Sequence, residues 1–213
     1  MAEQLLSFLM AGLIFGFSGG IAPGPTMAIV IAQAVQYDWK EGAKVAIAPL
    51  LTDGPIIVVG ISFLSLVREF EAVVGMVSLL GACFLSYLAY ESWNTKGMHV
   101  EVRTAKPRSL LKGVVANLLN PSPYLFWFTV GCPVILKAAD TSLLAVSAFI
   151  ATFFVGLVGT KVVVAILVGP FRSFLRSQGY VYIMRFLSFA LFVYALLFFL
   201  DGLHALGLLT SDP

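Results

Sequence analysis

Charge is scarce in this sequence, and that scarcity excludes a water-soluble domain. Of the 213 residues only 11% are charged, while 60% are hydrophobic. Soluble domains average roughly 25% charged and about 45–50% apolar residues. A chain with so little polar surface cannot cover a globule in water, so we predict an integral membrane protein rather than a soluble enzyme. The net charge of +2 also argues against nucleic acid as a partner.

Cysteine and histidine are almost absent, which leaves no spacing for a metal site. Cys83 and Cys132 both lie in apolar stretches, where a thiol usually packs as a small buried hydrophobic side chain. His99 and His204 are far apart in the sequence, so no metal ligands are predicted, and no cofactor is expected. The nucleotide-binding pattern Gly-x-x-x-x-Gly-Lys-[Ser/Thr] is missing as well.

Long hydrophobic runs fill most of the chain and predict membrane-spanning helices. Polar residues divide the chain into six segments of about the length, roughly 20 residues, that a helix needs to cross a bilayer. Segments of this length favour helices over the shorter alternating strands of a barrel. The sequence thus predicts an all-α protein in contact with the lipid bilayer. The expected spans are residues 5–36, 45–67, 72–91, 110–136, 142–170 and 181–203.

Lysine and arginine gather on one side of the expected helices. Ten of the 13 basic residues lie in or beside the first, third and fifth loops. Because short basic loops stay in the cytoplasm, we predict a multi-pass protein of the cell (cytoplasmic) membrane with both termini outside the cytoplasm. The ten residues are Lys40, Lys44, Lys96, Arg103, Lys106, Arg108, Lys112, Arg172, Arg176 and Arg185.

Three spans in each half predict an inverted internal repeat within one membrane domain, residues 1–213. The first repeat would comprise residues 1–97 and the second residues 108–213, joined by a cytoplasmic loop at 98–107. Since three is an odd number of crossings, the second repeat would run through the membrane in the opposite direction. Whether the chain forms a homo-oligomer stays open.

Matching proline motifs interrupt the first and fourth spans. Pro23-Gly24-Pro25 lies in the first and Pro121-Ser122-Pro123 in the fourth. Proline lacks an amide hydrogen and clashes with the preceding turn, so both motifs should break their helices. We expect half-helices to start at Thr26 and Tyr124, with free amides that attract anions. Matching interruptions in two halves of a transporter indicate its binding site; the alternative is that both are kinks used only for packing.

Two ionisable residues lie deep in the expected spans, at the level of the proline motifs. Counted at ~1.5 Å per residue from the cytoplasmic edge, Asp53, Lys161 and both motifs lie roughly 12–15 Å deep. A charge inside a membrane is costly and indicates a functional site. Asp53 would bind a substrate ammonium or a coupling proton, and Lys161 would hold Asp53 or a substrate carboxylate. The alternative is a structural ion pair between two helices.

The candidate substrate site combines these charges with the polar residues of the breaks. Asn120 lies closer to its break than Asn117, which could instead join helices. Asp53 and Lys161 are the ion-coupling candidates. The predicted substrate-binding residues are Pro23, Gly24, Pro25, Thr26, Asp53, Asn117, Asn120, Pro121, Ser122 and Lys161.

Two further patterns favour packing over a substrate role. Gly12, Gly16 and Gly20 recur every four residues, as in closely packed membrane helices, either within one chain or between chains. The aromatic run Phe126-Trp127-Phe128 and the pair Phe153-Phe154 are expected to pack or to face lipid.

In order along the chain, these motifs resemble those of the lysine exporter (LysE/RhtB) type of amino-acid exporters. The resemblance covers nearly the whole chain and rests on Ala22-Pro23-Gly24-Pro25, Asp53-Gly54 and Asn117-Leu118-Leu119-Asn120-Pro121. It implies export of amino acids or similar small metabolites driven by proton exchange.

Three positions depart from that family's pattern. Ala22 stands where serine is common, Thr52 precedes the acidic residue where glycine is usual, and Ser122 follows Asn-Pro where lysine is frequent. These departures limit what the resemblance implies about the substrate.

The function expected from the sequence is secondary active export of a small zwitterion, coupled to a proton or another ion. The first alternative is a metal or inorganic-ion exporter of the same architecture. A second is a transmembrane thiol-disulfide electron carrier, for which Cys132-Pro133 lies in the fourth span but the first break has no cysteine. A third is a purely structural membrane protein.

Overall fold

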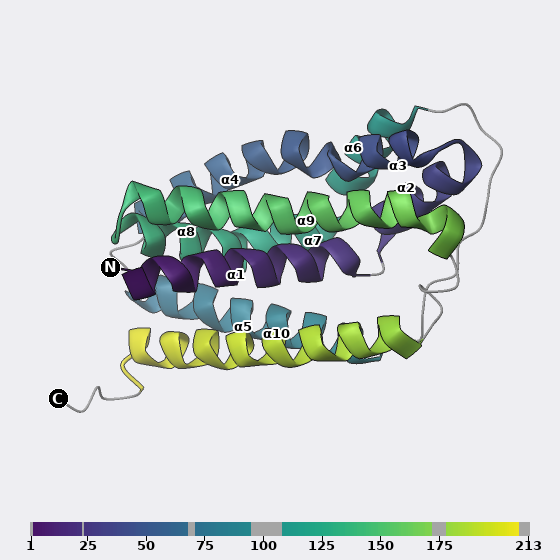
Figure 1. The fold of residues 1–213 in the computed structure, drawn as a ribbon. Helices are drawn as coiled ribbons and strands as arrows, with labels where there is room; N and C mark the ends of the chain where they lie inside the picture. The colour runs from purple at the N-terminus through teal and green to yellow at the C-terminus, as the bar shows by residue number, and fades with distance from the viewer. Residues whose placement is uncertain (1, 23, 68–70, 95–107, 172–177, 209–213) are drawn as a thin grey trace.

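The structure is a computed structural model that describes residues 2–22, 24–67, 71–94, 108–171 and 178–208. These residues are almost entirely helical (Figure 1). In chain order the helices are α1 (Ala2–Ile21), α2 (Pro25–Gln36), α3 (Trp39–Ala46), α4 (Ala48–Val67), α5 (Glu71–Trp93), α6 (Ser109–Leu118), α7 (Pro121–Phe126), the π-helical turn η1 (Trp127–Gly131), α8 (Cys132–Ala139), α9 (Leu143–Phe171) and α10 (Gln178–Ala205).

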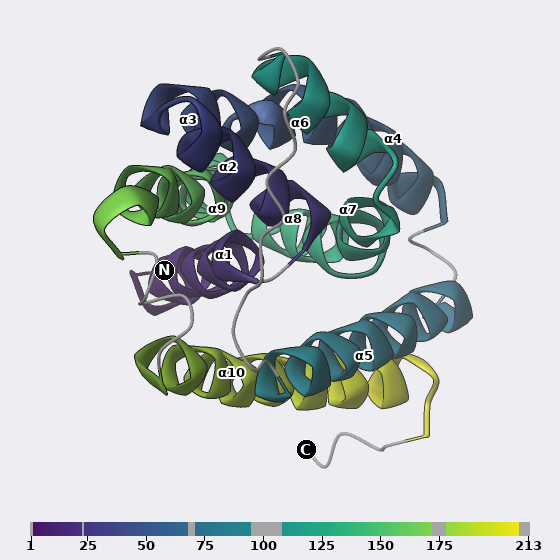
Figure 2. The ribbon, with the colours of Figure 1, turned by 90° about the vertical axis from the view of Figure 1, so that its right-hand side faces the viewer.

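The bundle consists of two parts, each held together by one closely packed pair of long helices. Helices α5 and α10 lie side by side along most of their length and form one layer (Figure 2). Helix α1 runs along α9 in the other part, together with α4 and the α7–η1–α8 segment. The short helices α2, α3 and α6 pack on one another at one end of this larger part.

The predicted all-helical membrane protein is confirmed. Helical structure covers most of each expected span, with interruptions in the first, second and fourth. In the part of the chain that is described, four stretches are long and apolar enough to cross a membrane: Glu3–Ile21, Trp39–Leu66, Leu143–Leu167 and Val181–Ala205. Shorter apolar helices occupy Pro25–Gln36, Gly75–Glu91 and Ser109–Leu118.

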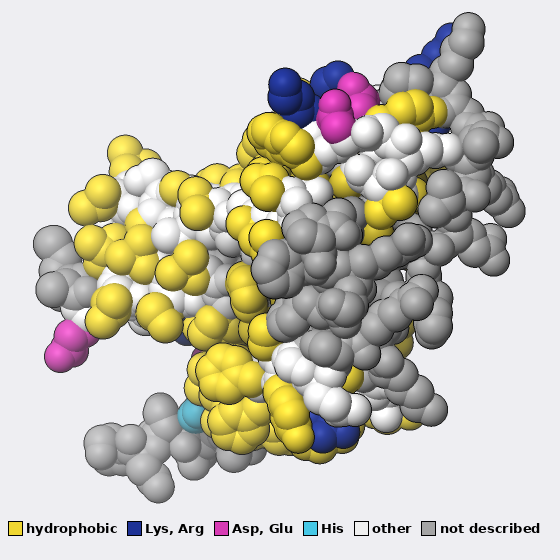
Figure 3. Space-filling model, turned by 45° about the vertical axis from the view of Figure 1, so that its right-hand side comes forward, with side chains coloured by type: hydrophobic (Ala, Val, Ile, Leu, Met, Phe, Trp, Pro, Cys, Tyr) yellow, Lys and Arg dark blue, Asp and Glu magenta, His cyan; other side chains and the backbone are white. Residues whose placement is uncertain are grey.

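The surface has the distribution expected of such a protein. Hydrophobic side chains are spread over the described part of the face in Figure 3, while the charged side chains lie mainly at its edges. Large apolar residues such as Val58, Phe63 and Leu66 on α4 are exposed. A surface of this kind is stable in lipid and would aggregate in water.

Both predicted helix breaks are present. Helix α1 ends at Ile21 and α2 begins at Pro25; α6 ends at Leu118 and α7 begins at Pro121. The expected start of the second half-helix at Tyr124 is wrong, because Pro121 occupies the first turn of α7. Proline is well accommodated there, where its missing N–H would have no partner in the helix. For the same reason α2 begins at Pro25 rather than at Thr26.

The glycines of α1 pack against α9 within the chain. A Cβ atom at Gly12 would meet the backbone oxygen of Phe149 at 2.5 Å, and one at Gly20 would lie 2.8 Å from the Thr160 Cβ. At Gly16 the nearest atoms belong to the backbone of Phe153. The predicted packing role of these glycines is confirmed, and the contact lies inside one chain.

We predict that Gly16→Ala destabilises the fold by about 1–3 kcal/mol, the usual cost of overpacking. The added methyl group would lie 2.8 Å from the backbone carbonyl carbon of Phe153, which cannot move without shifting α9. Gly159→Ala on α9 is the matched control, because nothing lies within 4 Å of the added Cβ and alanine favours helix. Thermal unfolding of both variants in the same detergent provides the comparison; equal midpoints would contradict the prediction.

Candidate functional site

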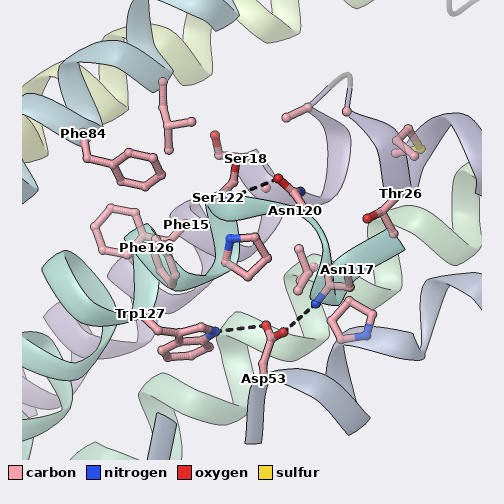
Figure 4. A pocket seen from close by; sticks show the side chains of 18 of the residues that line it. Phe15, Ser18, Thr26, Asp53, Phe84, Asn117, Asn120, Ser122, Phe126 and Trp127 are labelled. Atoms are coloured by element: carbon pink, nitrogen blue, oxygen red, sulfur yellow. Dashed lines mark hydrogen bonds between the residues drawn. The ribbon is translucent and has the colours of Figure 1, made fainter. Parts of the chain in front are cut away.

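A cavity of about 240 Å³ lies where the two helix breaks meet. Its wall includes residues from both breaks, from α4, and from the α5 and α10 layer (Figure 4). Of the predicted site residues, Pro23 lies outside the described residues and Pro121 begins α7 without lining the cavity. The predicted residues that do line it are Gly24, Pro25, Thr26, Asp53, Asn117, Asn120, Ser122 and Lys161.

Asp53 is buried on α4 and receives hydrogen bonds from three side chains. Asn117 donates its Nδ2 hydrogen to Oδ1 at 2.8 Å, and the Thr52 hydroxyl contacts the same oxygen at 3.2 Å. Trp127 donates its indole N–H to Oδ2 at 3.0 Å. Figure 4 shows the carboxylate between Asn117 and Trp127. Since each carboxylate oxygen has two acceptor sites, Oδ2 keeps one for a further donor.

Local sequence explains why these donors converge on α4. Asn117 lies one residue before the end of α6, so the break before α7 brings it beside Thr52, to which it also donates at 2.7 Å. Trp127 is the first residue of η1, and π-helical turns are frequent at functional sites. Gly131, at the other end of η1, leaves room for the indole, because a Cβ there would overlap the Trp127 ring.

Lys161 lies against the end of α1 and not against Asp53. Its Nζ donates to the backbone oxygens of Gly19 at 2.8 Å and Gly20 at 3.4 Å. In the described chain, no ion pair within 4.0 Å joins Lys161 to Asp53, although both line the cavity. The last carbonyls of a helix lack partners and carry negative partial charge, so Lys161 stabilises α1 where it stops. Two of its three N–H groups are used there.

Thr26 is a buried hydroxyl without a partner. It is 6% exposed and lines the cavity in the first turn of α2. Its Oγ1 has no hydrogen-bond partner among the described atoms, and no side chain of the described residues caps α2 at Gly24. The first amides of a helix carry positive partial charge. A buried polar group of this kind needs a partner, which a bound ligand would supply.

The two asparagines have different roles. Asn120 accepts a hydrogen bond from the Ser122 backbone N–H at 3.1 Å and caps α7, as asparagine commonly does. Asn117 instead holds Asp53 directly. Both asparagines line the cavity. Asn117, which lies farther from the break, is the one that contacts the Asp53 carboxylate.

Aromatic rings close the cavity away from the breaks. Phe126 stacks on Phe153 with ring centres 5.1 Å apart, and Phe15 packs edge-on against Phe126 at 5.8 Å. Phe15 also contacts Tyr194 of α10, with 4.6 Å between ring centres. Rings at these distances attract one another beyond the apolar area they bury, so they form a continuous aromatic wall.

Sequence reasoning missed several members of the site. It assigned Trp127 to packing or lipid, whereas the indole is fully buried and donates to Asp53. The signal available was chemical, because a buried tryptophan usually needs a partner for its N–H. Phe126 and Phe153, which the sequence also assigns to packing or lipid, line the cavity together with Glu91, which no sequence pattern singles out.

The cysteines are free and lie on different helices. Cys132 is buried and approaches the backbone oxygen of Ile57 at 3.7 Å, which agrees with the expected packing role. Cys83 is exposed on α5, so the expected burial is wrong for that residue. It faces outward on a helix whose inner side packs on α10.

Comparisons with known proteins agree with this architecture. The family model described as LysE type translocator matches residues 17–202. The chain is also similar to the chemotactic transduction protein ChpE of Pseudomonas aeruginosa, with 22% identity over 131 residues. That match covers 60% of this chain and 64% of ChpE, so it spans less than two thirds of that relative's length. No solved structure matches the chain.

We predict that Trp127→Phe lowers the free energy of unfolding by about 1.5–3 kcal/mol, the usual worth of a hydrogen bond to a charged group. The phenyl ring keeps most of the buried apolar contact, but the Asp53 carboxylate loses the donor to Oδ2. Trp39→Phe, at an exposed position, should have little effect. In an Asp53→Asn background the cost of Trp127→Phe should shrink by more than half. An undiminished cost would show that the indole acts by packing alone.

Proposed function

The chain belongs to the LysE type translocator family, and on that premise we propose that it exports amino acids or similar small zwitterionic metabolites. The observation that supports this most is the single cavity that combines Asp53, Lys161 and the N-terminus of α2. A zwitterion needs an anionic and a cationic partner within the span of one small molecule. Members of this family are transporters and not enzymes, so the chemistry required is binding and release.

The carboxylate of the solute would bind at the start of α2. Thr26 offers an unpartnered hydroxyl there, the first-turn amides add positive partial charge, and Lys161 retains a third N–H beyond its two bonds to α1. The ammonium group would bind the open acceptor site of Asp53. The three donors on Asp53 fix the direction of that site, which favours a solute of one geometry.

The size and charge of the cavity narrow the solute class. A volume of about 240 Å³ lies below the roughly 300–1,000 Å³ of pockets for drug-sized ligands, so a solute of few heavy atoms fits. A bare metal cation would face the charge of Lys161, and the described residues include no group of three or more His, Cys, Asp or Glu side chains that could hold one. The cavity therefore supports a zwitterion better than an inorganic cation.

Export against a gradient requires coupling, for which Asp53 and Lys161 are the candidates. We propose that Asp53 accepts a proton when the solute ammonium leaves, so that the buried carboxylate is never left without a cationic partner. An uncompensated charge in the membrane interior is costly. Proton binding at this site would thus alternate with solute binding, as exchange requires.

We further propose six membrane crossings arranged as two inverted repeats. The two broken helical segments, α1–α2 and α6–α8, occupy corresponding places in the two halves of the chain, as in transporters built from inverted repeats. Both termini would lie outside the cytoplasm, because most lysines and arginines lie in the first, third and fifth loops. Many of these basic residues lie at 95–107 and 172–177, outside the described residues.

Inside-out vesicles provide the test of export and of Asp53 together. Vesicles that contain the protein should accumulate labelled amino acids when a proton gradient is imposed, and vesicles without it should not. Asp53→Asn should abolish gradient-driven uptake, because it removes both the charge and the exchangeable proton. Glu3→Gln, at an exposed carboxylate in the first turn of α1 that lines neither cavity, is the control and should transport normally. Uptake by Asp53→Asn at the unmutated rate would reject the role of this residue.

We predict that Thr26→Val weakens solute binding about tenfold while leaving the fold as stable or slightly more stable. Valine has nearly the same shape, and the hydroxyl it replaces is buried without a partner, which costs free energy in the empty protein. In the loaded protein the same change removes a hydrogen bond. Half-saturation for uptake and the melting temperature, measured on one preparation, separate the two effects. A loss of stability with unchanged binding would contradict the assignment.

A further inference from the structure

A second cavity of about 680 Å³ lies in the same bundle, farther from the helix breaks. Its wall comes from the first half of α1, from α5, α8 and α10, and its lining includes Ala11, Ser78 and Lys137. Lys137 forms an ion pair with Asp201 at 3.2 Å, and both side chains are exposed. The second cavity therefore has a mainly apolar wall and a charged, exposed rim.

On three helices, residues that line one cavity are followed along the helix by residues that line the other. On α1, Ala11 lines the second cavity and Phe15, one turn later, lines the first. On α10, Leu191 lines the first cavity and Tyr194 the second. On α5 the change occurs between Ser78 and Phe84. A single layer of side chains thus separates the two cavities.

The centre of that layer is the contact between Phe15 and Tyr194. Their ring centres are 4.6 Å apart, and Phe15 also packs against Phe126. Phe15 is buried and belongs to the first cavity, whereas Tyr194 belongs to the second. The contact joins α1 to α10, and so joins the larger part of the bundle to the α5–α10 layer.

Both cavities lie along the boundary between those two parts. Helices α5 and α10 pack tightly on each other, as shown by Gly75 and Gly202, where an added Cβ would lie 3.1 Å from the other glycine's backbone oxygen. Near the boundary between the two cavities, Gly81 of α5 packs against the backbone of Thr129 in η1. Figure 2 shows α5 and α10 as a separate layer beside the rest. A pair of this kind can move as one body about a narrow contact.

We propose that the second cavity is the compartment through which the solute is released, and that the contact between Phe15 and Tyr194 is the gate between it and the Asp53 cavity. In this structure the gate is closed. Movement of the α5–α10 pair against α1 would separate the two rings and join the cavities. The charged rim at Lys137 and Asp201 then gives a polar solute a hydrated way out. The inference rests on the proposed function only in that a solute passes through the Asp53 cavity.

Thiol labelling tests the gate without knowledge of the solute. The parent carries Cys83→Ala and Cys132→Ala, and single cysteines are added as Ser18→Cys, which lines the first cavity, or Ser78→Cys, which lines the second. A charged maleimide that does not cross membranes is applied to one side of sealed vesicles at a time. We expect the two cysteines to react from opposite sides. Phe15→Ala should speed the reaction of Ser18→Cys from the Ser78 side by at least about tenfold.

Two controls separate gating from general loosening. Tyr194→Phe keeps the ring and should leave the labelling rate unchanged. Phe149→Ala removes a fully buried ring of the same core that lines neither cavity, and it should also leave the rate unchanged.

Three results would overturn the gate: labelling of both cysteines from the same side, no reaction of Ser78→Cys from either side, or equal acceleration by Phe15→Ala and Phe149→Ala. If labelling follows the expected pattern but no amino acid is transported, the proposed solute is wrong and the gate stands.

Discussion

A buried carboxylate among hydrophobic helices is the constraint on which this structure depends. The Asp53 side chain is 3% exposed, and its charge is tolerable there because three donors contact it from α4, α6 and η1. A charge within a membrane is costly unless it is paired or hydrogen-bonded. The end of α6 and the π-helical turn therefore have the same structural role, since each places one hydrogen-bond donor beside Asp53.

The two helix breaks create four helix ends whose backbone groups need hydrogen-bond partners. The described residues supply such partners at three of these ends. Helix ends leave backbone groups without partners. Lys161 donates to the last carbonyls of α1, Asn120 caps α7, and the backbone N–H of Leu119 returns to Val115 at the end of α6. At the start of α2, the buried Thr26 hydroxyl has no hydrogen-bond partner among the described residues. A site for a transported molecule has this property, because its polar groups are satisfied only when it is occupied.

The sequence predicted what depends on local chemistry and missed what depends on packing at a distance. Proline lacks an N–H, so both breaks could be predicted. The predicted start of α7 at Tyr124 was wrong, because proline is well accommodated in the first turn of a helix and α7 begins at Pro121. The cost of an intramembrane charge singled out Asp53 and Lys161. The donor role of Trp127 required knowing that α4 passes beside η1, and the partner of Lys161 required knowing that α9 lies against the end of α1. Neither relation leaves a local pattern.

The π-helical turn also sets the rotation of everything that follows it. In an ordinary α-helix, residues five apart point in directions about 140° apart, because each residue turns the chain by roughly 100°. In η1 the N–H of Cys132 bonds to the oxygen of Trp127, and this wider turn stacks the two residues on one face. Both can then contact α4, Trp127 at Asp53 and Cys132 at Ile57. Deletion of one residue from η1 would leave the helix continuous but rotate either Trp127 or Cys132 away from α4.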